Sequence, residues 1–510
     1  MDKILVLDFG AQYAHLICRR IRELGVYAEL APFDISPSQI RARRAKGLIL
    51  SGGPMSVYEK KAPLPNPEVY SMGLPVLGIC YGLQAIVHQK GGSVQRHDKR
   101  EYGKAVLSPD KSSPLFESVQ EETVCWMSHG DAAAAIPKDF KSIARTENSP
   151  YAAISSDSLY AVQFHPEVTQ TEEGIQILSN FVYNICKCEK NWTTGKMIEE
   201  EVSNLQSKIG PSDKVLCALS GGIDSATTAE LLLKAIGNRL YCVFVDNGLL
   251  RKGERERIEA TFRPKLGKNL IVVDRSKQFL SKLKGVRDPE RKRKIVGKEF
   301  INAFVAVSRK IGKVQWLAQG TLYTDVIESA SGASKHESKI KSHHNVGGMP
   351  RKLKFKLVEP LRDLYKDEVR KIAEALGLPK ELVYTHPFPG PGLSVRIMGE
   401  VTNEKIRIAR EASSIVEEEL YNAQLHDKVW QAYAAVGDDL ATGVLGDLRS
   451  VGHIAIVRIV ESKEAMTADW SKVPFPILER ISGRITNEVS GVTWVTYAIS
   501  SKPPSTIEPQ

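Results

Sequence analysis

The chain has 510 residues, of which 42% are hydrophobic and 25% charged, and its formal net charge is +10. This length predicts about three domains, and the composition is typical of a globular chain rather than a disordered or fibrous one. No apolar run reaches the roughly 18 residues that a membrane span requires, so we expect no membrane partner. Residues 1–8 lack the pattern of a signal peptide and are predicted to form a first β-strand.

The cysteines and the basic residues limit the compartment and the partners. There are seven cysteines, without the spacing of a disulfide framework, and we expect reduced thiols in a cytoplasmic protein. Lysine and arginine are dispersed along the chain, with short runs such as residues 291–294. Binding of anionic nucleotides therefore explains the positive charge better than binding of nucleic acid does.

Residues 1–190 alternate short apolar strands with helical patterns, which predicts an α/β domain with a mainly parallel sheet. Within it, a strand runs into Cys80 and a helix is expected from about Gly82. Gly78 and Gly82 flank the thiol as in the nucleophile elbow of hydrolases, with cysteine in place of serine. A helix N-terminus beside the sulfur favours the thiolate. Taken alone, Cys80 is also compatible with a buried core thiol.

A second motif, His165-Pro166-Glu167, supplies the groups that a thiol nucleophile needs. If the chain is extended here, His165 and Glu167 face the same side. The carboxylate then orients the imidazole and raises its basicity, which gives a base and an orienting group. Together with the elbow around Cys80, this pair predicts a catalytic site.

These motifs resemble the class I glutamine amidotransferases. The resemblance implies that Cys80 attacks the side-chain amide of glutamine, releases ammonia and leaves a thioester that water hydrolyses. It also implies that the backbone N–H groups of Gly53 and Tyr81 form an oxyanion hole. Gln84 and residues 127–131 resemble the glutamine-contacting segments of that family. A plain turn remains an alternative for Gly53.

Residues 191–385 form the second predicted domain, a doubly wound α/β nucleotide-binding fold. A strand over 215–219, a Gly-rich turn and a helix over 226–236 make a phosphate cradle. The turn lacks P-loop spacing and resembles the SGGxDS loop of ATP pyrophosphatases, which cut ATP between its α- and β-phosphates. An ordinary Gly-rich turn is the alternative. The ATP-binding residues predicted here are Ser220, Gly221, Gly222, Asp224 and Ser225.

Acidic and basic residues further along extend this predicted site. Asp246 ends the next strand and is expected near the nucleoside half of ATP, or else caps a turn. Asp325 and Glu328 share a face if their segment is helical, which suits Mg²⁺ bound with ATP, although a solvated acidic pair is equally compatible. The polar stretch 329–339 predicts a lid. The lid residues expected at pyrophosphate and adenylate are Lys341, His343 and His344.

Residues 386–510 form the third predicted domain, which begins at the rigid turn cluster 386–393. A helix is expected over 404–421 and strands over 454–459 and 493–499, which predicts an α+β fold.

The order of the three parts, with a tail that reads KPPSTIE, resembles the GMP synthetase family of the fused, glutamine-hydrolysing type. The resemblance implies amination of xanthosine monophosphate (XMP) to GMP through an adenylated intermediate, with glutamine, ATP and XMP as partners. It further implies Mg²⁺ with ATP, no prosthetic group, and a homodimer through the C-terminal domain. The XMP contacts that it implies are Arg293, Pro389, Gly390, Gly392, Gln431, Lys502, Ile507 and Glu508.

Several residues depart from the family pattern and put nucleotide affinity and the dimer interface in doubt. Trp494 stands where the family has a phosphate-binding arginine, which tryptophan cannot replace. Ala498 replaces an aspartate, Val451 an aromatic residue, and Pro509-Gln510 the usual Trp-Glu end. Two alternatives stay open. One is another ligase with this pyrophosphatase loop, such as an NAD synthetase or a tRNA-thiolating enzyme. The other is a nucleotide-binding regulatory paralogue without synthesis.

Overall fold

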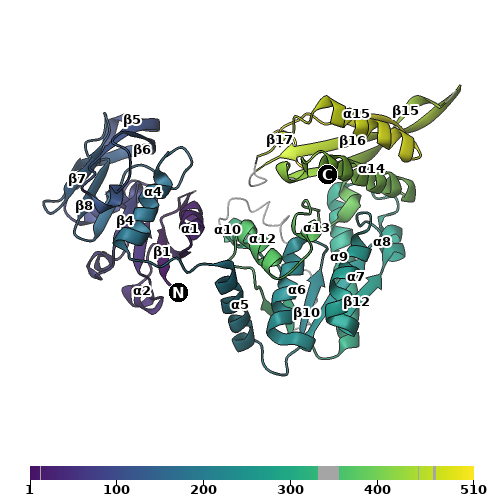
Figure 1. Cartoon of the computed structure of the whole chain (residues 1–510), viewed down its shortest axis with the longest axis horizontal. Coiled ribbons are helices and arrows are strands. Elements are labelled where there is room, and N and C mark those ends of the chain that lie inside the picture. Colours follow the sequence, from purple (N-terminus) through teal and green to yellow (C-terminus); the bar gives the residue numbers. More distant parts are fainter. Residues whose placement is uncertain (12, 331–354, 446, 463–466) are drawn as a thin grey trace. The chain divides into compact units, whose positions relative to one another are not determined.

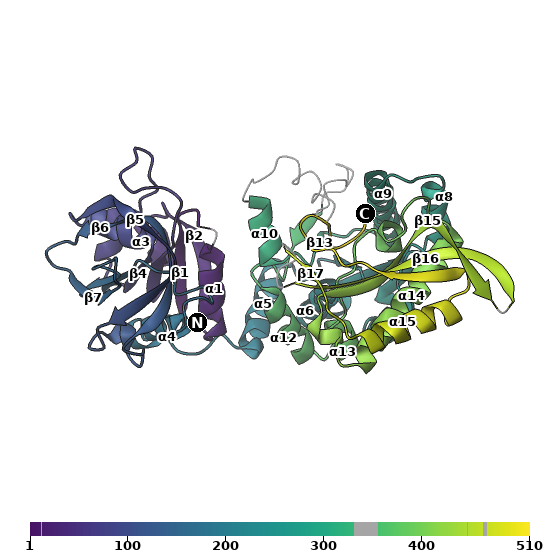
Figure 2. The same cartoon turned by 90° about the horizontal axis from the view of Figure 1, so that it is seen from above.

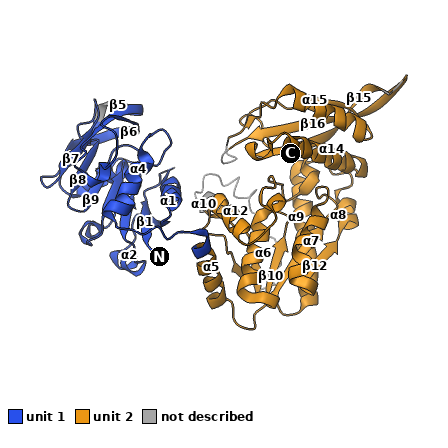
Figure 3. Ribbon diagram, viewed as in Figure 1, with its two compact units in different colours: residues 1–196 blue, residues 197–510 orange. Residues whose placement is uncertain are grey.

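The computed structural model describes the chain except residues 12, 331–354, 446 and 463–466, and it describes residues 97–100, 327–330 and 445 by their backbone alone. It falls into two compact units, Met1–Lys196 and Met197–Gln510 (Figure 3). The three-domain division at about 190 and 385 therefore stays a prediction. Within the described part of the chain, no helix is both long and apolar enough to cross a membrane.

The first unit is built on a nine-stranded sheet with strand order β2-β1-β3-β4-β9-β8-β7-β5-β6 (Figure 1). The strands from β2 to β9 pair in parallel, and those from β9 to β6 pair antiparallel. The predicted parallel sheet is thus one half of a mixed sheet. The strands are β1 (Lys3–Asp8), β2 (Tyr27–Pro32), β3 (Gly47–Leu50), β4 (Val76–Ile79), β5 (Ser93–Pro109), β6 (Thr123–Ala135), β7 (Lys141–Arg145), β8 (Ala153–Ser156) and β9 (Leu159–Val162).

Both faces of this sheet are buried, because alternate residues of a strand point to opposite sides. Ile4 and Val6 of β1 lie in one core cluster with Ile17 of α1. Leu5 and Leu7 lie in another, with residues of α2 and α3. The helices are α1 (Ala14–Glu23), α2 (Pro37–Ala42), α3 (Tyr81–Gln89) and α4 (Gly174–Ser179), with 3₁₀ turns at Pro67–Ser71 and Pro114–Phe116 and a π-helical turn at Asn180–Ile185.

The second unit contains a five-stranded parallel sheet with strand order β12-β11-β10-β13-β14. The order reverses between β10 and β13, and ligands of such sheets bind at this switch point, beyond the carboxyl ends of the strands. The predicted doubly wound fold is confirmed. The strands are β10 (Val215–Leu219), β11 (Leu240–Asp246), β12 (Leu270–Asp274), β13 (Trp316–Ala318) and β14 (Lys356–Val358).

Helices surround this parallel sheet (Figure 1). Val243 and Val245 of β11 share a core cluster with Phe279 of α8 and Val296 of α9, while α6 packs on β10 and β11. The helices are α5 (Thr194–Lys208), α6 (Ile223–Ile236), α7 (Glu254–Leu266), α8 (Ser276–Leu283), α9 (Pro289–Ile311), α10 (Tyr323–Ala330), α12 (Lys366–Ala375) and α13 (Lys380–Val383), with 3₁₀ turns at Gly237–Arg239, Gly267–Asn269 and Gly392–Val395.

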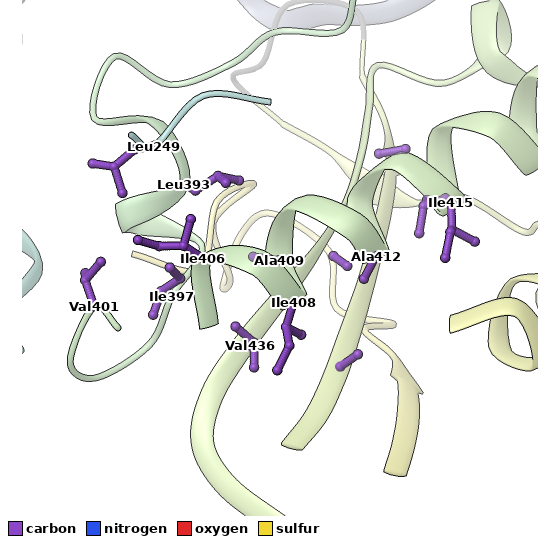
Figure 4. Close-up of a cluster of buried hydrophobic side chains, with 14 of the residues drawn as sticks. Leu249, Leu393, Ile397, Val401, Ile406, Ile408, Ala409, Ala412, Ile415 and Val436 are labelled. Atoms are coloured by element: carbon purple, nitrogen blue, oxygen red, sulfur yellow. The ribbon is translucent and has the colours of Figure 1, made fainter. Parts of the chain in front are cut away.

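The C-terminal part of the second unit is α+β, as predicted. Two long antiparallel strands, β15 and β16, run side by side (Figure 2), and β17 and β18 both pair with β16. Helix α14 packs its apolar face against β15, with Ile408 and Ala412 in the same core as Val436 (Figure 4). The elements are α14 (Asn403–Asn422), a 3₁₀ turn (His426–Lys428), β15 (Gln431–Leu445), β16 (Leu448–Glu461), β17 (Asp469–Trp470), α15 (Phe475–Glu488) and β18 (Val492–Tyr497).

Candidate functional site

Cys80 lies in the sharp turn between strand β4 and helix α3, where it is the residue before the first helical turn. Its backbone has φ 52° and ψ −102°, a conformation that non-glycine residues seldom adopt. Backbone strain of this kind is concentrated at functional sites. The predicted elbow is therefore present, with a buried thiol, 6% exposed, at the N-terminus of a helix.

The two glycines of the elbow are required by close backbone packing. A Cβ on Gly78 would lie 2.6 Å from the carbonyl group of Gly82. A Cβ on Gly82 would lie 2.4 Å from the carbonyl oxygen of Leu50. Any larger residue at either position would push α3 away from the sheet, so the turn that holds Cys80 depends on both glycines.

His165 and Glu167 form a buried pair beside the thiol. His165 Nδ1 donates a hydrogen bond of 2.7 Å to Glu167 Oε1, and the residues are 5% and 1% exposed. The predicted contact is correct, but its reason is different: β9 ends at Val162, and the pair lies in the turn that follows. The backbone N–H of His165 bonds to the carbonyl of Trp126 on β6, 3.0 Å away, which anchors this turn to the sheet.

The pair strongly favours the protonated imidazole. Burial lowers the pKa of His165, but the Glu167 carboxylate and hydrogen bonds to Cys80 and Glu167 outweigh it and raise the pKa to about 11. The buried imidazole thus carries its positive charge beside the Cys80 sulfur, the arrangement that the predicted nucleophile and base require.

Gly52 and Gly53 pack beside the thiol. Gly52 lies against both members of the site, because a Cβ there would be 3.2 Å from His165 Cε1 and 3.8 Å from Cys80 Cβ. Gly53 packs on the ring of Tyr81, at 3.2 Å by the same measure. The loop that carries Gly52 and Gly53 therefore lies beside the elbow, and its role as an oxyanion hole stays a prediction.

Two glutamines adjoin this site. Gln84 Nε2 donates to the backbone carbonyl of Asp131, 2.8 Å away, and so ties α3 to β6. Gln163 Nε2 lies 3.7 Å from Cys80 Sγ. Sequence reasoning assigned no role to Gln163, although its place two residues before His165 is a usable signal.

In the second unit, the residues of the SGGIDS loop connect β10 to α6 at the switch point of the sheet. Ser225 Oγ organises the turn: it accepts from the Ser220 backbone N–H at 3.1 Å and donates to the Gly222 carbonyl at 2.9 Å. Gly221 has φ +81°, and a Cβ there would lie 2.0 Å from Glu254 Oε1. The loop therefore requires glycine for its conformation and its space.

The acidic residues of this site have basic partners. Asp224 accepts two hydrogen bonds from Lys366 Nζ of α12, at 2.6 and 2.7 Å. Asp246, at the carboxyl end of β11, accepts from the Gly248 N–H at 2.9 Å and lies 3.5 Å from Arg255. Asp246 therefore caps a turn, as the alternative predicted, and lies at the strand end where a nucleotide is expected.

The remaining residues of this predicted centre are only partly described. Asp325 and Glu328 both fall on α10, so the helical condition for a shared face is met. Asp325 Oδ2 accepts from the Leu322 N–H at 2.9 Å. The Glu328 side chain and the lid residues Lys341, His343 and His344 lie outside the described part of the structure.

Four of the predicted nucleotide residues come together around the C-terminal tail. Gln431 Nε2 donates to Glu508 Oε1. Tyr433 OH donates to the carbonyl of Ile507 at 2.6 Å. Arg293 donates to the carbonyl of Gln510, so the unusual end of this chain is anchored in place.

The turn cluster 386–393 borders the same region, and Lys502 is placed separately. The Leu393 N–H donates to the Leu249 carbonyl at 2.9 Å, and the positive φ of Gly392 (+64°) permits that approach. The ring of Phe388 carries two guanidinium groups, Arg251 at 4.5 Å and Arg396 at 4.9 Å from its centroid. Lys502 pairs through its backbone with Ala468. Pro389 and Gly390 belong to this turn, with Gly390 exposed.

The departures from the family pattern lie mostly at the surface. Trp494 is 54% exposed and donates to the Thr442 carbonyl at 3.1 Å. Val451 is 67% exposed. Ala498 is half-buried, and its carbonyl accepts a 3.1 Å bond from Arg458.

The sequence matches known protein families, and it matches relatives over its whole length. The class-I glutamine amidotransferase family matches residues 5–185, and the family described as the GMP synthase C-terminal domain matches residues 418–509. A GMP synthase (glutamine-hydrolyzing) of Brachyspira hyodysenteriae is 51% identical over 512 residues, which cover 100% of this chain and 99% of that protein. One from Caldanaerobacter subterraneus is 51% identical over 509 residues and covers 99% of each chain. A crystal structure of a GMP synthase subunit from Thermoplasma acidophilum is 34% identical, covers 37% of this chain and 94% of that chain, and has a TM-score of 0.35.

Proposed function

The chain belongs to the family of glutamine-hydrolysing GMP synthases, and we propose that it converts XMP to GMP with glutamine as the nitrogen donor. ATP is cleaved to AMP and pyrophosphate in this reaction. The observation that carries the proposal is the thiol elbow at Cys80 with its buried His165–Glu167 pair, in a chain that also holds an SGGIDS loop at a sheet switch point.

At the first centre, the Cys80 thiolate attacks the side-chain amide carbon of glutamine. The backbone N–H groups of Gly53 and Tyr81 donate to the developing oxyanion. The His165 imidazolium gives its proton to the departing nitrogen, and ammonia leaves. The neutral imidazole then removes a proton from water, which attacks the thioester and releases glutamate and the thiolate. Glu167 keeps the ring in the required tautomer throughout.

At the second centre, O2 of XMP attacks the α-phosphorus of ATP, and pyrophosphate leaves. Ser220, Gly221 and Gly222 supply the turn that receives this anion, because N–H groups at a helix N-terminus attract phosphate. Ammonia then attacks C2, and AMP departs with the original oxygen. Adenylation is needed because it converts a poor leaving oxygen into a good one.

Mg²⁺ is proposed to enter with ATP, and Asp325 and Glu328 would hold it. Their carboxylates are hard oxygen donors of the kind that Mg²⁺ prefers, and the ion takes most of its other ligands from phosphate and water. The backbone of α10 places both residues on one helical turn. When bound, the ion neutralises charge on the phosphates.

The XMP contacts, the homodimer and a cytoplasmic location belong to the same proposal. Arg293, Gln431, Ile507 and Glu508 support the pocket because they meet at the tail. Exposed apolar side chains on β15, β16 and β18 support a dimer through this part of the chain.

The test is a reaction of the purified protein with XMP, Mg-ATP and either glutamine or an ammonium salt. GMP and AMP are expected in equal amounts with both nitrogen sources. Absence of GMP with ammonium would refute the synthetase assignment. Calorimetric binding of nucleotide without turnover would instead favour the regulatory paralogue.

A further inference from the structure

Arg396 is an almost completely buried arginine for which the proposed reaction has no role. It is 1% exposed and belongs to the segment that follows the turn Gly392–Val395. Leu393 and Ile397 fix this segment in the core of the second unit (Figure 4). A buried arginine is retained only where its charge is paired and its donors are satisfied.

The guanidinium of Arg396 is held in one orientation from several sides. Its plane lies over Phe388 at 4.9 Å and over Tyr433 at 4.2 Å from the ring centroids. Its edge makes a bidentate pair with Glu508, from Nη2 to Oε1 at 2.9 Å and from Nε to Oε2 at 3.1 Å. Two aromatic neighbours and a forked ion pair leave the side chain little freedom.

The neighbours of Arg396 hold the rest of the tail. Tyr433 OH bonds to the Ile507 carbonyl, and Gln431 bonds to Glu508. Lys292, which is 0% exposed, donates to Gln510 Oε1 at 2.7 Å and to the carbonyls of Ser394 and Ile397. We call the set Lys292, Arg396, Gln431 and Tyr433 the tail clamp.

We propose that Arg396 is a positioning residue for the nucleotide substrate, which acts by fixing the Glu508 carboxylate inside the tail clamp. This inference rests on the proposed function. A carboxylate offers about four acceptor sites, and Arg396 and Gln431 occupy three of them. In this proposal the remaining site accepts from a hydroxyl or N–H donor of the nucleotide, and the fork of Arg396 fixes the carboxylate that offers it.

The first test measures XMP binding by isothermal titration, which needs no turnover. Arg396→Met is expected to weaken XMP binding roughly tenfold or more, because it leaves the Glu508 carboxylate without its charged partner. Arg396→Lys keeps the charge but loses the fork, so its effect should be intermediate. Arg407→Met is the matched control, since Arg407 pairs with Glu411 at 2.9 Å on the half-exposed side of α14. Affinity for ATP should be unchanged in every variant.

The second test follows the tail directly by hydrogen exchange. The amides of residues 505–508 and 510 should exchange faster in Arg396→Met and in Glu508→Gln than in the wild type or in Arg407→Met. Glu508→Gln keeps the test decisive if Arg396→Met does not fold. XMP affinity within about twofold of Arg407→Met, or an unchanged tail, would overturn the inference. Failure of the wild type to make GMP while the affinity difference persists would refute the proposed function alone.

Discussion

Cys80 is the residue proposed to attack glutamine in the glutamine-dependent half of the reaction. Replacing it with alanine removes the only atom proposed to attack glutamine. We expect Cys80→Ala to lose glutamine-dependent GMP formation by roughly 10⁴-fold or more and to keep the ammonium-dependent reaction. The measurement is GMP formation with each nitrogen source. Cys188→Ala is the control, because this thiol is similarly buried, at 7% exposure. Retention of glutamine use by Cys80→Ala would show that the nucleophile is another residue.

His386 gives the folded chain a defined response to acid. Its ring stacks on His426 at 3.9 Å, and Nε2 donates to the His426 carbonyl at 3.0 Å. Nδ1 has no hydrogen-bond partner among the described residues. Burial, and then the neighbouring His426, lower the pKa of His386 to about 4.

The direction of the resulting pH dependence follows from the unfolded chain, in which a histidine has a pKa of about 6.5. Above that pH the side chain is neutral in both states, so its contribution to the free energy of unfolding is fully present. As the pH falls towards about 4, the unfolded state takes up a proton that the folded state does not, and this contribution is lost. Between these limits the wild type should lose about 3 kcal/mol relative to His386→Gln in denaturant titrations. His88→Gln, at the exposed end of α3, should track the wild type. Parallel pH profiles for wild type and His386→Gln would contradict this.

Individual residue types were predictable where their chemistry is local, and their distant partners were not. The elbow around Cys80 and the turn at Ser220 follow from neighbouring glycines in the chain. The Lys366 partner of Asp224 is 142 residues away, and the Glu508 partner of Arg396 is 112 residues away. Only the tertiary fold brings such pairs together, so no short motif contains them.

The turn before α6 contains Gly221, where the steric effect of a side chain can be measured separately from the strain of a positive φ. Gly221→Ala combines an unfavourable positive φ with a Cβ placed 2.0 Å from Glu254 Oε1. Gly237, at the other end of α6, also has a positive φ (+59°) but no atom within 4 Å of such a Cβ. Both alanine variants should lose about 1–2 kcal/mol in the free energy of unfolding, because alanine disfavours a positive φ. Only Gly221→Ala should also lose affinity for ATP.

The measurements are thermal unfolding of both variants and the KM for ATP in the ammonium-dependent reaction. We expect a loss of Tm in both variants, larger in Gly221→Ala because of the Glu254 clash, and a KM for ATP that rises roughly tenfold or more in Gly221→Ala alone. An equal change in KM in the two variants would mean that the contact between residue 221 and Glu254 has no effect on ATP binding.

Local periodicity predicted which segments form helices and strands, but it predicted their ends and their pairing less well. The helix expected over 404–421 is α14, at Asn403–Asn422. The strand expected over 493–499 ends earlier, at Tyr497. For His165 and Glu167 the extended-chain argument gave the right contact through the wrong element, because a turn also brings i and i+2 side chains together. The antiparallel half of the first sheet had no signal, since strand pairing is long-range.

For the molecule as a whole, the surface of the C-terminal sheet makes a prediction about assembly. Val444, Leu448, Val451 and Trp494 are 72%, 76%, 67% and 54% exposed on β15, β16 and β18. A monomer seldom leaves so many large apolar side chains in water on adjacent strands. We expect a homodimer in solution, with these residues in its interface.

Leu448→Asp should therefore convert the dimer to a monomer in light scattering coupled to gel filtration, because it buries a charge without a partner. Phe475→Asp is the matched control, since Phe475 is 86% exposed but lies at the start of helix α15 rather than on a strand. A wild type that is monomeric, or a Leu448→Asp variant that stays dimeric, would place the interface elsewhere.

The ring of Phe388 limits which substitutions the positions around it can tolerate. The guanidinium groups of Arg251 and of Arg396 in the tail clamp both lie over this ring, and the backbone N–H of Arg251 bonds to Glu254, which adjoins Gly221. Substitutions at such touching positions do not add independently. Loss of the ring removes an aromatic contact from two cations at once, the half-buried Arg251 and the buried Arg396. We therefore expect positions 251, 388 and 396 to change together or not at all, and a change at one of them to be tolerated only in the background of the others.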